Sequence, residues 1–330
     1  MTPPPSFADV EAARGRIADW VRRTPLLSSP FLDEVAGRRV FVKPECLQHT
    51  GSFKFRGACS ALSALDPDTR ARGVIAFSSG NHAQGVAMAA RMFGVPAVIV
   101  MPSDAPRLKI ENTRRLGAEV VLYDRELQDR DEIGTRLAAE RGLSLIRPFD
   151  DPRVIGGQGT VGMEIAEDAA ALGIHDADVL VPCGGGGLSA GVALALEAMA
   201  PDLRLRTVEP AGFDDVARSL RAGEICRNDR LVGSVCDAII TPAPGVVPFP
   251  ILLRCAGPGL VVSDAEALRA MAAAFLRLKI VVEPGGAVAL AAALFRSAEL
   301  EGDSVVVVAS GGNVDPAVFA RALETDPGNV

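Results

Sequence analysis

The chain has 330 residues, of which 48% are hydrophobic and 23% are charged, and this composition is ordinary for a globular protein. Its formal net charge of −7 argues against nucleic acid as a partner, because no surplus of basic side chains exists to neutralise phosphates. The chain contains no run of about 18 apolar residues, so neither a membrane span nor a membrane partner is expected.

The N-terminal stretch MTPPPSFADVEAARGR is polar and lacks the apolar segment of a secretory signal, so we expect a cytoplasmic protein. Six cysteines are scattered without a C-x-x-C pair, which argues against a zinc ribbon and is typical of reduced thiols. Only three histidines occur, so a metal centre built from several histidines is not expected.

Short apolar runs alternate with helical patterns along the chain. The predicted strands are Arg39–Lys43, Val74–Phe77, Ala97–Met101, Glu119–Tyr123, Asp178–Pro182, Arg204–Val208 and Ser304–Ala309. Stretches rich in Ala, Leu, Arg and Glu, such as Gly80–Phe93 and Ala265–Leu278, are predicted to be helices. Continuous apolar strands that alternate with helices indicate an α/β protein whose parallel sheets are covered on both faces.

The βα units fall into two series, one from about residue 67 to 150 and the other from about 151 onward. Pro148, Asp150, Asp151 and Pro152 form a turn-rich stretch between them. The sequence therefore predicts two groups of strands and helices that meet near residue 150.

Lys54 lies in the segment TGSFKFRGA, between the bulky side chains of Phe53 and Phe55. A lysine near the start of a helix is ordinarily a solvated surface residue. An amine held in an apolar pocket, in contrast, loses its proton more easily and can form a Schiff base with an aldehyde. Lys54 is therefore a candidate nucleophile.

The segment FSSGNHAQG, which starts at Phe77, follows the strand VIAF and leads into a helical pattern. The side chains of Ser78, Ser79 and Asn81, with the exposed N–H groups of the helix start, suit a carboxylate or a phenolate-like oxygen. A helix cap made by Ser or Asn explains the same pattern equally well.

Four consecutive glycines occur in VLVPCGGGGLSAG, where a strand ends and a helical pattern opens. Glycine lets backbone N–H groups approach an anion closely, and the helix dipole adds to the attraction, so this loop is a candidate phosphate site. It is neither a Walker A loop nor a clean G-x-G-x-x-G, and a nicotinamide dinucleotide remains possible at this point.

A second glycine loop, SGGNVD from Ser310, also follows a predicted strand. Ligands of open α/β sheets bind outside the carboxyl ends of the strands, so the two glycine loops could face one pocket. A plain turn explains SGGN as well as a binding site does.

The segments TGSFKFRGA, SSGNHAQG, PCGGGGLSAG and SGGNVD occur in an order and spacing that resemble the fold-type II pyridoxal-phosphate (PLP) enzymes, most closely the serine/threonine dehydratase and serine racemase group. The resemblance extends from about Arg23 to about Leu323. It implies a tryptophan synthase β-like fold, with two open, twisted, mostly parallel sheets flanked by helices. Residues 1–66 and 151–330 would form a large PLP-binding domain, and residues 67–150 a small mobile substrate-binding domain. Family habit also implies a homodimer.

The resemblance implies a role for each matching residue. Lys54 would form the Schiff base with PLP and later shuttle protons, Phe53 would pack beside the pyridine ring, and Asn81 would hydrogen-bond the phenolic oxygen. Gly184, Gly185, Gly186 and Gly187 would bind the phosphate, and Ser310 would face the pyridine nitrogen. Ser78, Ser79 and His82 would surround the substrate carboxylate, and Ser79 could also act on the opposite face of the α-carbon.

The resemblance further suggests a cation site in the segment EPAGFDD. Its ligands would be Glu209, the backbone carbonyl of Phe213, and Asp215. Oxygen ligands suit Mg²⁺ or Ca²⁺ completed by water. Phe213 is bulkier than the small residue expected there, and an acidic surface loop is the alternative interpretation.

The implied reaction is dehydration and deamination of L-threonine or L-serine to a 2-oxo acid and ammonia. Elimination from 3-hydroxyaspartate and racemisation of serine remain alternatives within the same group. β-Replacement is less favoured, because those relatives typically carry TSGNTG where this chain has SSGNHA. A nucleotide-binding or regulatory protein without catalysis is the third alternative. The chain ends soon after the catalytic segments, which favours a catabolic enzyme over a biosynthetic one that carries a regulatory domain.

Overall fold

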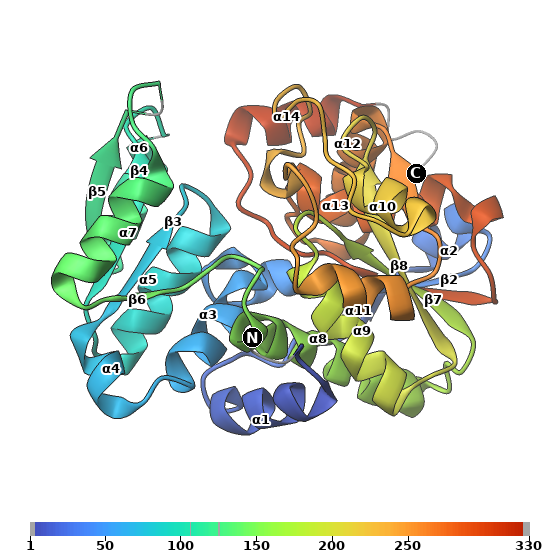
Figure 1. Cartoon of the computed structure of the whole chain (residues 1–330). Helices are drawn as coiled ribbons and strands as arrows, with labels where there is room; N and C mark the ends of the chain where they lie inside the picture. The colour runs from blue at the N-terminus through green and yellow to red at the C-terminus, as the bar shows by residue number, and fades with distance from the viewer. Residues whose placement is uncertain (1–3, 106, 125, 326–330) are drawn as a thin grey trace.

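The computed structural model describes residues 4–105, 107–124 and 126–325, which form two sheets flanked by helices (Figure 1). The larger sheet has the strand order β1-β2-β10-β7-β8-β9, and the smaller has β5-β4-β3-β6. Only β1 and β2 pair antiparallel among the described strands. The strands are β1 (Leu27–Ser28), β2 (Arg39–Lys43), β3 (Val74–Phe77), β4 (Ala97–Pro102), β5 (Glu119–Tyr123), β6 (Ser144–Leu145), β7 (Ala177–Pro182), β8 (Leu203–Pro210), β9 (Leu260–Val262) and β10 (Ser304–Val308).

Helices cover both faces of each sheet. The smaller sheet is flanked by α4 (Pro67–Arg72), α5 (Asn81–Phe93), α6 (Arg107–Arg115) and α7 (Arg130–Arg141). The rest of the chain contributes α1 (Phe7–Ile17), α2 (Pro30–Ala36), α3 (Lys54–Ser63), α8 (Pro152–Leu172), α9 (Gly187–Met199), α10 (Asp215–Ala222), α11 (Pro248–Cys255), α12 (Asp264–Ala273), α13 (Pro284–Phe295) and α14 (Pro316–Glu324). Short helical turns are η1 (Glu45–Leu47), η2 (His49–Gly51), η3 (Asp237–Ile239), η4 (Ala274–Leu278) and η5 (Ser297–Glu299). Within the described ranges, no helix is both long and apolar enough to cross a membrane.

Strand β10 illustrates why the sheets are built from continuous apolar runs. Val305 and Val307 pack into the core with α12 and α13, while Val306 and Val308 pack into the core with α8 and α9. All four side chains are fully buried. A strand buried on both faces needs apolar residues at every position, which explains why no alternation appears in the sequence.

The predicted fold class is confirmed, and all seven predicted strands are present within two residues of their predicted ends. The sequence patterns did not indicate β1, β6 and β9, which have only two or three residues each. The single helix predicted for Ala265–Leu278 is α12 continued by the π-helical turn η4.

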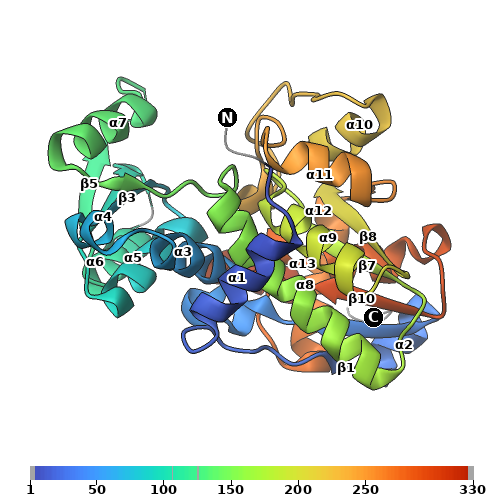
Figure 2. The same ribbon diagram turned by 60° about the horizontal axis from the view of Figure 1, so that its bottom comes forward.

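Helix α3 lies between the two sheets, where it packs against both α5 and α8 (Figure 2). Its buried residues Phe55 and Leu62 belong to the same core as Val74 of β3 and Ile99 of β4. The helix therefore shares the core of the smaller sheet, although it precedes residue 67. The domain boundaries and the mobility of residues 67–150 stay predictions.

A buried cation anchors the other side of α3 to the larger sheet. Arg56 is fully buried, and its Nε donates to Glu45 Oε2 at 2.8 Å while its Nη1 donates to Glu164 Oε1 at 2.7 Å. The Nζ of Lys43 lies 2.7 Å from the other oxygen of Glu164. This network connects α3 to η1, α8 and β2. Its central residue, Arg56, lies two positions after Lys54 in the chain.

Replacement of Arg56 by Ala should destabilise the protein strongly, because it leaves the buried carboxylate of Glu45 without its cation. A buried pair broken on one side costs about 3–5 kcal/mol in the free energy of unfolding. Arg254→Ala is the control, since Arg254 and Glu197 form an ion pair on the surface and such pairs contribute about 1 kcal/mol or less. Urea denaturation of both variants measures the difference, and an equal loss in the two would contradict the anchoring role.

Candidate active site

Lys54 is the first residue of α3 and its side chain is half-buried. Its Nζ donates a hydrogen bond to the carbonyl oxygen of Pro148 at 2.9 Å. Burial lowers the pKa of Lys54 to about 8, and the negative charge of Glu283 opposes this shift only in part. A substantial fraction of the amine is therefore neutral near physiological pH, as a nucleophile requires.

A tight turn brings Lys54 beside the SGGN loop. Thr50 and Gly51 have φ values of 59° and 74°, so the chain reverses through the left-handed region. Ser52 then pairs with Gly311 in an isolated antiparallel bridge, and the N–H of Phe53 donates to the carbonyl of Ser310 at 3.1 Å. The second glycine loop thus lies directly against the lysine segment.

Asn81, at the start of α5, connects these segments to the SSGN loop. Its Nδ2 donates to Glu283 Oε1 at 2.6 Å, and its Oδ1 accepts from Asn313 Nδ2 at 2.7 Å. Burial raises the pKa of Glu283 to about 7, while the hydrogen bond from Asn81 acts in the opposite direction. Three segments that are far apart in the chain therefore meet at one amide.

The residues predicted to bind the substrate carboxylate surround the start of α5. Ser78 and Ser79 are half-buried, and Ser78 Oγ accepts a hydrogen bond from the N–H of Gly80. His82 is buried and its Nε2 lies 2.9 Å from the carbonyl oxygen of Ile146. Burial, followed by the charge of Lys54, lowers the pKa of His82 to about 3, so the ring is neutral. If Nε2 is the donor, Nδ1 is an acceptor and cannot donate to a carboxylate. Backbone N–H groups at this helix start are therefore better carboxylate ligands than His82.

The four-glycine loop connects β7 to α9. Gly186 has a φ of 90°, and a Cβ added to Gly185 would lie 2.4 Å from the ring of Phe149. A Cβ on Gly187 would lie 2.9 Å from the backbone of the same phenylalanine. The N–H groups of Gly184, Gly185 and Gly186 donate to no backbone acceptor among the described residues. The loop therefore offers unpaired donors that only glycine permits, as an anion site requires.

The predicted cofactor residues are brought together by these contacts. Phe149 covers the glycine loop and directly follows Pro148, the residue that holds the amine of Lys54. Ser310, 4% exposed, follows β10 and contacts the backbone of Phe53. The set offers an amine, an anion cradle, an amide and a hydroxyl at the carboxyl ends of parallel strands. These groups fit the aldehyde, phosphate, phenolic oxygen and ring nitrogen of PLP.

Three contributions to this site were not singled out from the sequence. They are the carboxylate of Glu283, the amide of Asn313 and the carbonyl of Pro148. Glu283 precedes a proline at the start of α13, and this EP pair at a helix start was the only local signal for it. Asn313 lies in the SGGN loop found in the sequence, but its bond to Asn81 and the role of the Pro148 carbonyl have no sequence pattern.

The predicted cation ligands lie at the carboxyl end of β8. Glu209 is fully buried, and its two oxygens accept from the N–H groups of Val216 and Ala217 at 2.8 and 2.7 Å. Asp215 accepts a hydrogen bond from Asn228 Nδ2 at 2.6 Å through Oδ1, whereas its buried Oδ2 has no partner in the described part of the chain. Burial, followed by the charge of Asp215, raises the pKa of Glu209, and burial raises that of Asp215 to about 6.

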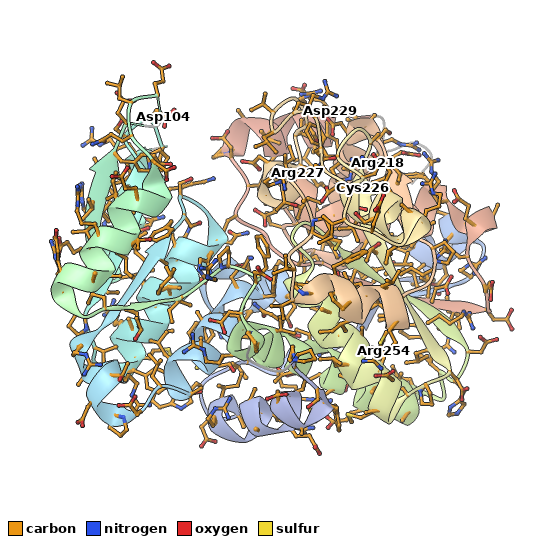
Figure 3. All side chains as sticks on the ribbon, in the orientation of Figure 1. Asp104, Arg218, Cys226, Arg227, Asp229 and Arg254 are labelled. Carbon is orange, nitrogen blue, oxygen red and sulfur yellow. The ribbon has the colours of Figure 1, made fainter. Side chains whose placement is uncertain are left out.

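An orphaned carboxylate oxygen beside a second buried carboxylate fits a divalent cation. The side chain of Phe213 is buried, and Arg230 lies over its ring at 5.1 Å, so the bulky residue is accommodated without opening the loop. No group of three His, Cys, Asp or Glu side chains that could hold a metal occurs among the described residues, so a cation here would need the Phe213 carbonyl and water. Figure 3 shows Arg218 and Cys226 near this loop, whereas Arg254 lies apart from them on α11.

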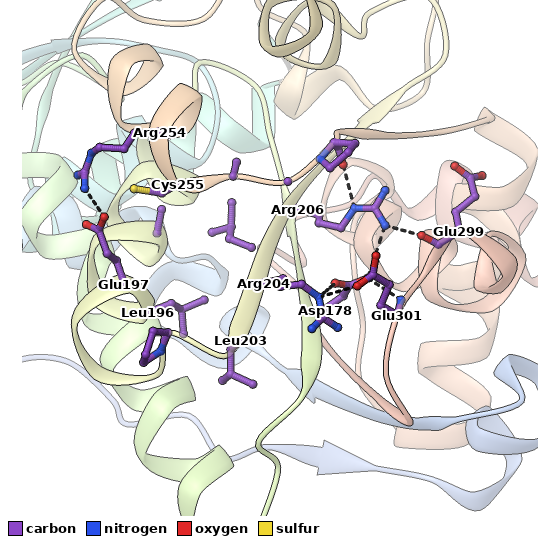
Figure 4. Close-up of a pocket in the computed structure, with 16 residues that line it drawn as sticks. Asp178, Leu196, Glu197, Leu203, Arg204, Arg206, Arg254, Cys255, Glu299 and Glu301 are labelled. Carbon is purple, nitrogen blue, oxygen red and sulfur yellow. Dashed lines mark hydrogen bonds and ion pairs between the residues drawn. The ribbon is translucent and has the colours of Figure 1, made fainter.

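A cavity of about 480 Å³ lies away from Lys54, at the amino ends of β7 and β8 (Figure 4). Its charged side chains already have partners: Arg204 Nε donates to Asp178 Oδ1 at 3.0 Å, and Arg206 Nε donates to the Pro258 carbonyl at 2.9 Å. Because ligands of open α/β sheets bind at the carboxyl ends, this cavity is not the candidate active site.

Comparison with known families matches residues 17–311 to the family described as pyridoxal-phosphate dependent enzyme. The chain belongs to this family. Its cofactor is therefore PLP, in agreement with the geometry around Lys54 and the glycine loop.

Similar proteins include both ammonia-lyases and racemases. The L-threo-3-hydroxyaspartate ammonia-lyase of Pseudomonas sp is 44% identical over 97% of this chain and 98% of its own length, and that of Saccharomyces cerevisiae is 42% identical over 97% and 96%. The solved structure of a threonine deaminase from T.th. is 46% identical, with a TM-score of 0.89 over 94% of this chain and 99% of that one. Maize serine racemase is 36% identical, with a TM-score of 0.89 over 97% of both chains. The chain is thus an enzyme of the ammonia-lyase type.

The lowered pKa of Lys54 predicts how fast the PLP-free enzyme captures PLP at different pH values. Because only the neutral amine attacks the aldehyde, the capture rate should rise as the pH approaches 8 and level off above it. Stopped-flow absorbance after mixing with PLP measures this rate. A midpoint near 10.5, the ordinary value for lysine, would contradict the assignment. Lys54→Ala is the control and should give no adduct that borohydride fixes.

Proposed function

We propose that this enzyme eliminates water from a small L-β-hydroxy amino acid, after which hydrolysis of the resulting imine by water releases ammonia and leaves a 2-oxo acid. The observation that carries the proposal is the amine of Lys54, whose pKa is lowered to about 8 and which bonds to Pro148, the neighbour of the residue that covers the glycine loop. PLP supplies an electrophilic aldehyde and a conjugated ring that stabilises negative charge at the α-carbon of a bound amino acid.

The amine of Lys54 has two duties in this proposal. It would hold the cofactor, and in its neutral form it would take the proton from the substrate α-carbon. The Pro148 carbonyl, 2.9 Å from Nζ, orients the amine. Ser79 lies in the loop that precedes α5, and we assign its hydroxyl to the substrate, either as a carboxylate ligand or as an acid on the other face of the α-carbon.

The start of α5 would bind the substrate carboxylate through backbone N–H groups and the hydroxyls of Ser78 and Ser79. Ser310 would leave the ring nitrogen largely unprotonated, because a neutral hydroxyl cannot stabilise a positive charge there as a carboxylate does. This would temper charge withdrawal into the ring and favour loss of the β-hydroxyl.

L-Threonine and L-serine are the first substrates we propose, and the similarity to the T.th. threonine deaminase supports them. L-threo-3-Hydroxyaspartate is the second, because two similar proteins carry that name. The second carboxylate of this substrate would need a positively charged side chain as its partner. Lys109 on α6 is a candidate, since its charge lowers the pKa of Glu283 and its ammonium therefore lies within electrostatic reach of the site.

A substrate panel tests the reaction and separates these candidates. Purified enzyme should form 2-oxobutyrate from L-threonine, pyruvate from L-serine or oxaloacetate from L-threo-3-hydroxyaspartate, and a chiral assay should follow D-serine. If Lys109 binds a second carboxylate, Lys109→Met should lower kcat/KM for hydroxyaspartate by about tenfold or more, with little effect on serine. Arg107→Met on the same helix is the control, because Arg107 is exposed and paired with Glu111. Absence of every 2-oxo acid from enzyme with PLP on Lys54 would refute the lyase proposal.

We also propose that Glu209, the Phe213 carbonyl and Asp215 hold Mg²⁺ or Ca²⁺. The buried Asp215 oxygen without a partner in the described part of the chain and the raised pKa values of both carboxyls support this site. A cation there would neutralise two buried charges and fix the loop between β8 and α10.

The stabilisation by the cation should depend on pH. The pKa of Asp215 is raised to about 6, so its ionised form is disfavoured in metal-free protein, and a cation stabilises only that form. The difference in Tm between Mg²⁺-loaded and EDTA-treated enzyme should therefore grow as the pH rises through about 6. Asp215→Asn should remove most of this difference. A Tm that EDTA leaves unchanged at every pH, with Mg²⁺ and with Ca²⁺, would exclude the site.

A homodimer and a cytoplasmic location remain predictions. The exposed rings of Phe31 and Phe275 support self-association, and the contact of Arg277 with the Phe31 ring at 4.7 Å brings the two segments close together. An apolar surface of this kind suits burial between subunits.

A further inference from the structure

The hydrogen-bond partners of Asn81 determine which way its side-chain amide points. At one end of the chain of contacts, the Thr50 carbonyl accepts from Asn313 Nδ2 at 2.8 Å, and a carbonyl can only accept. The same Nδ2 lies 2.7 Å from the Asn81 side chain, which must therefore present its oxygen there. At the other end, an ionised Glu283 can only accept, so Asn81 must present its Nδ2.

This arrangement leaves one N–H of Asn81 without an acceptor among the described residues. Nδ2 carries two hydrogens, and only the one directed at Glu283 Oε1 has a partner, at 2.6 Å. The free N–H belongs to the residue assigned to the phenolic oxygen of PLP. Without both anchors the amide could rotate and turn its oxygen toward that phenolic oxygen, where two acceptors would repel.

Glu283 is itself held rigidly. It is 6% exposed, its N–H donates to the Gly311 carbonyl at 2.9 Å, and a Cβ on Gly311 would lie 2.2 Å from its Oε1. Burial raises the pKa of Glu283 to about 7, and the charge of Asp237 on η3 adds to this rise, whereas the hydrogen bond from Asn81 and the charges of Lys109 on α6 and Lys54 on α3 lower it. Above a pH of about 7 the carboxyl is ionised and can only accept, which is the form that holds the amide.

We propose that Glu283 is a positioning residue that, through its hydrogen bond to Asn81, directs an N–H of that side chain at the phenolic oxygen of PLP. It acts between the two sheets, because Glu283 precedes α13 beside the larger sheet whereas Asn81 begins α5 beside the smaller one. The inference rests on the PLP placement given under the proposed function.

The test measures PLP binding to the apoenzyme. Absorbance titration gives the affinity, and the visible spectrum reports the environment of the bound cofactor. Glu283→Ala should weaken PLP binding by about tenfold and shift the visible absorbance band, because the amide is no longer held. Glu283→Gln keeps an oxygen acceptor at the same distance and should restore both properties nearly to wild type. Glu283→Asp keeps the charge but withdraws the oxygen, and should resemble Glu283→Ala even if the alanine variant fails to fold.

A double-mutant cycle separates positioning from general structural damage. In an Asn81→Ala background, Glu283→Ala should weaken PLP binding no further, because its effect passes through the missing amide. An additive loss of PLP affinity in the double variant would overturn the inference. So would wild-type binding and a wild-type spectrum in Glu283→Ala, if Asn81→Ala binds PLP weakly. Borohydride reduction of the wild-type holoenzyme is done first, because the absence of PLP on Lys54 would refute the proposed function rather than the role of Glu283.

Discussion

The buried ion pairs of Arg56 are the constraint on which the site depends. Helix α3 shares its apolar side with the core of the smaller sheet, so packing alone would attach Lys54 to that side. The bonds of Arg56 to Glu45 and Glu164 attach the same helix to the larger sheet. Because a buried guanidinium without its carboxylates is costly, the start of α3 is held between the sheets, where the amine of Lys54 bonds to the Pro148 carbonyl.

The polar groups of the site are linked by contacts between residues far apart in the chain. Lys54 bonds to Pro148, the next residue covers the glycine loop, and Asn81 joins Asn313 and Glu283. In this setting burial shifts three pKa values. It lowers those of Lys54 and His82 and raises that of Glu283, so the amine and the imidazole are more neutral than in water.

The sequence predicted the parts of the fold that local pattern controls. Strands with four or more apolar residues, such as those around Val74 and Val305, were found because burial on both faces requires apolar residues throughout. The strands Leu27–Ser28 and Ser144–Leu145 were missed, because two residues form a strand only when a neighbour supplies the hydrogen bonds. The motifs around Lys54 and the glycines were visible because their chemistry requires particular residue types next to one another.

The order of amino acids was enough to specify the family and its cofactor, and it placed four glycines where the fold leaves no room for side chains. The groups that orient the side chains of the site are identified only by the folded structure. Glu283 and Asn81 are 202 positions apart and Asn313 and Asn81 are 232 apart, so no local spacing connects them. Likewise, the pKa of Lys54 depends on burial by surrounding segments of the chain. Such contacts arise only when the sheets and α3 are packed together, because desolvation and hydrogen-bond geometry depend on three-dimensional neighbours.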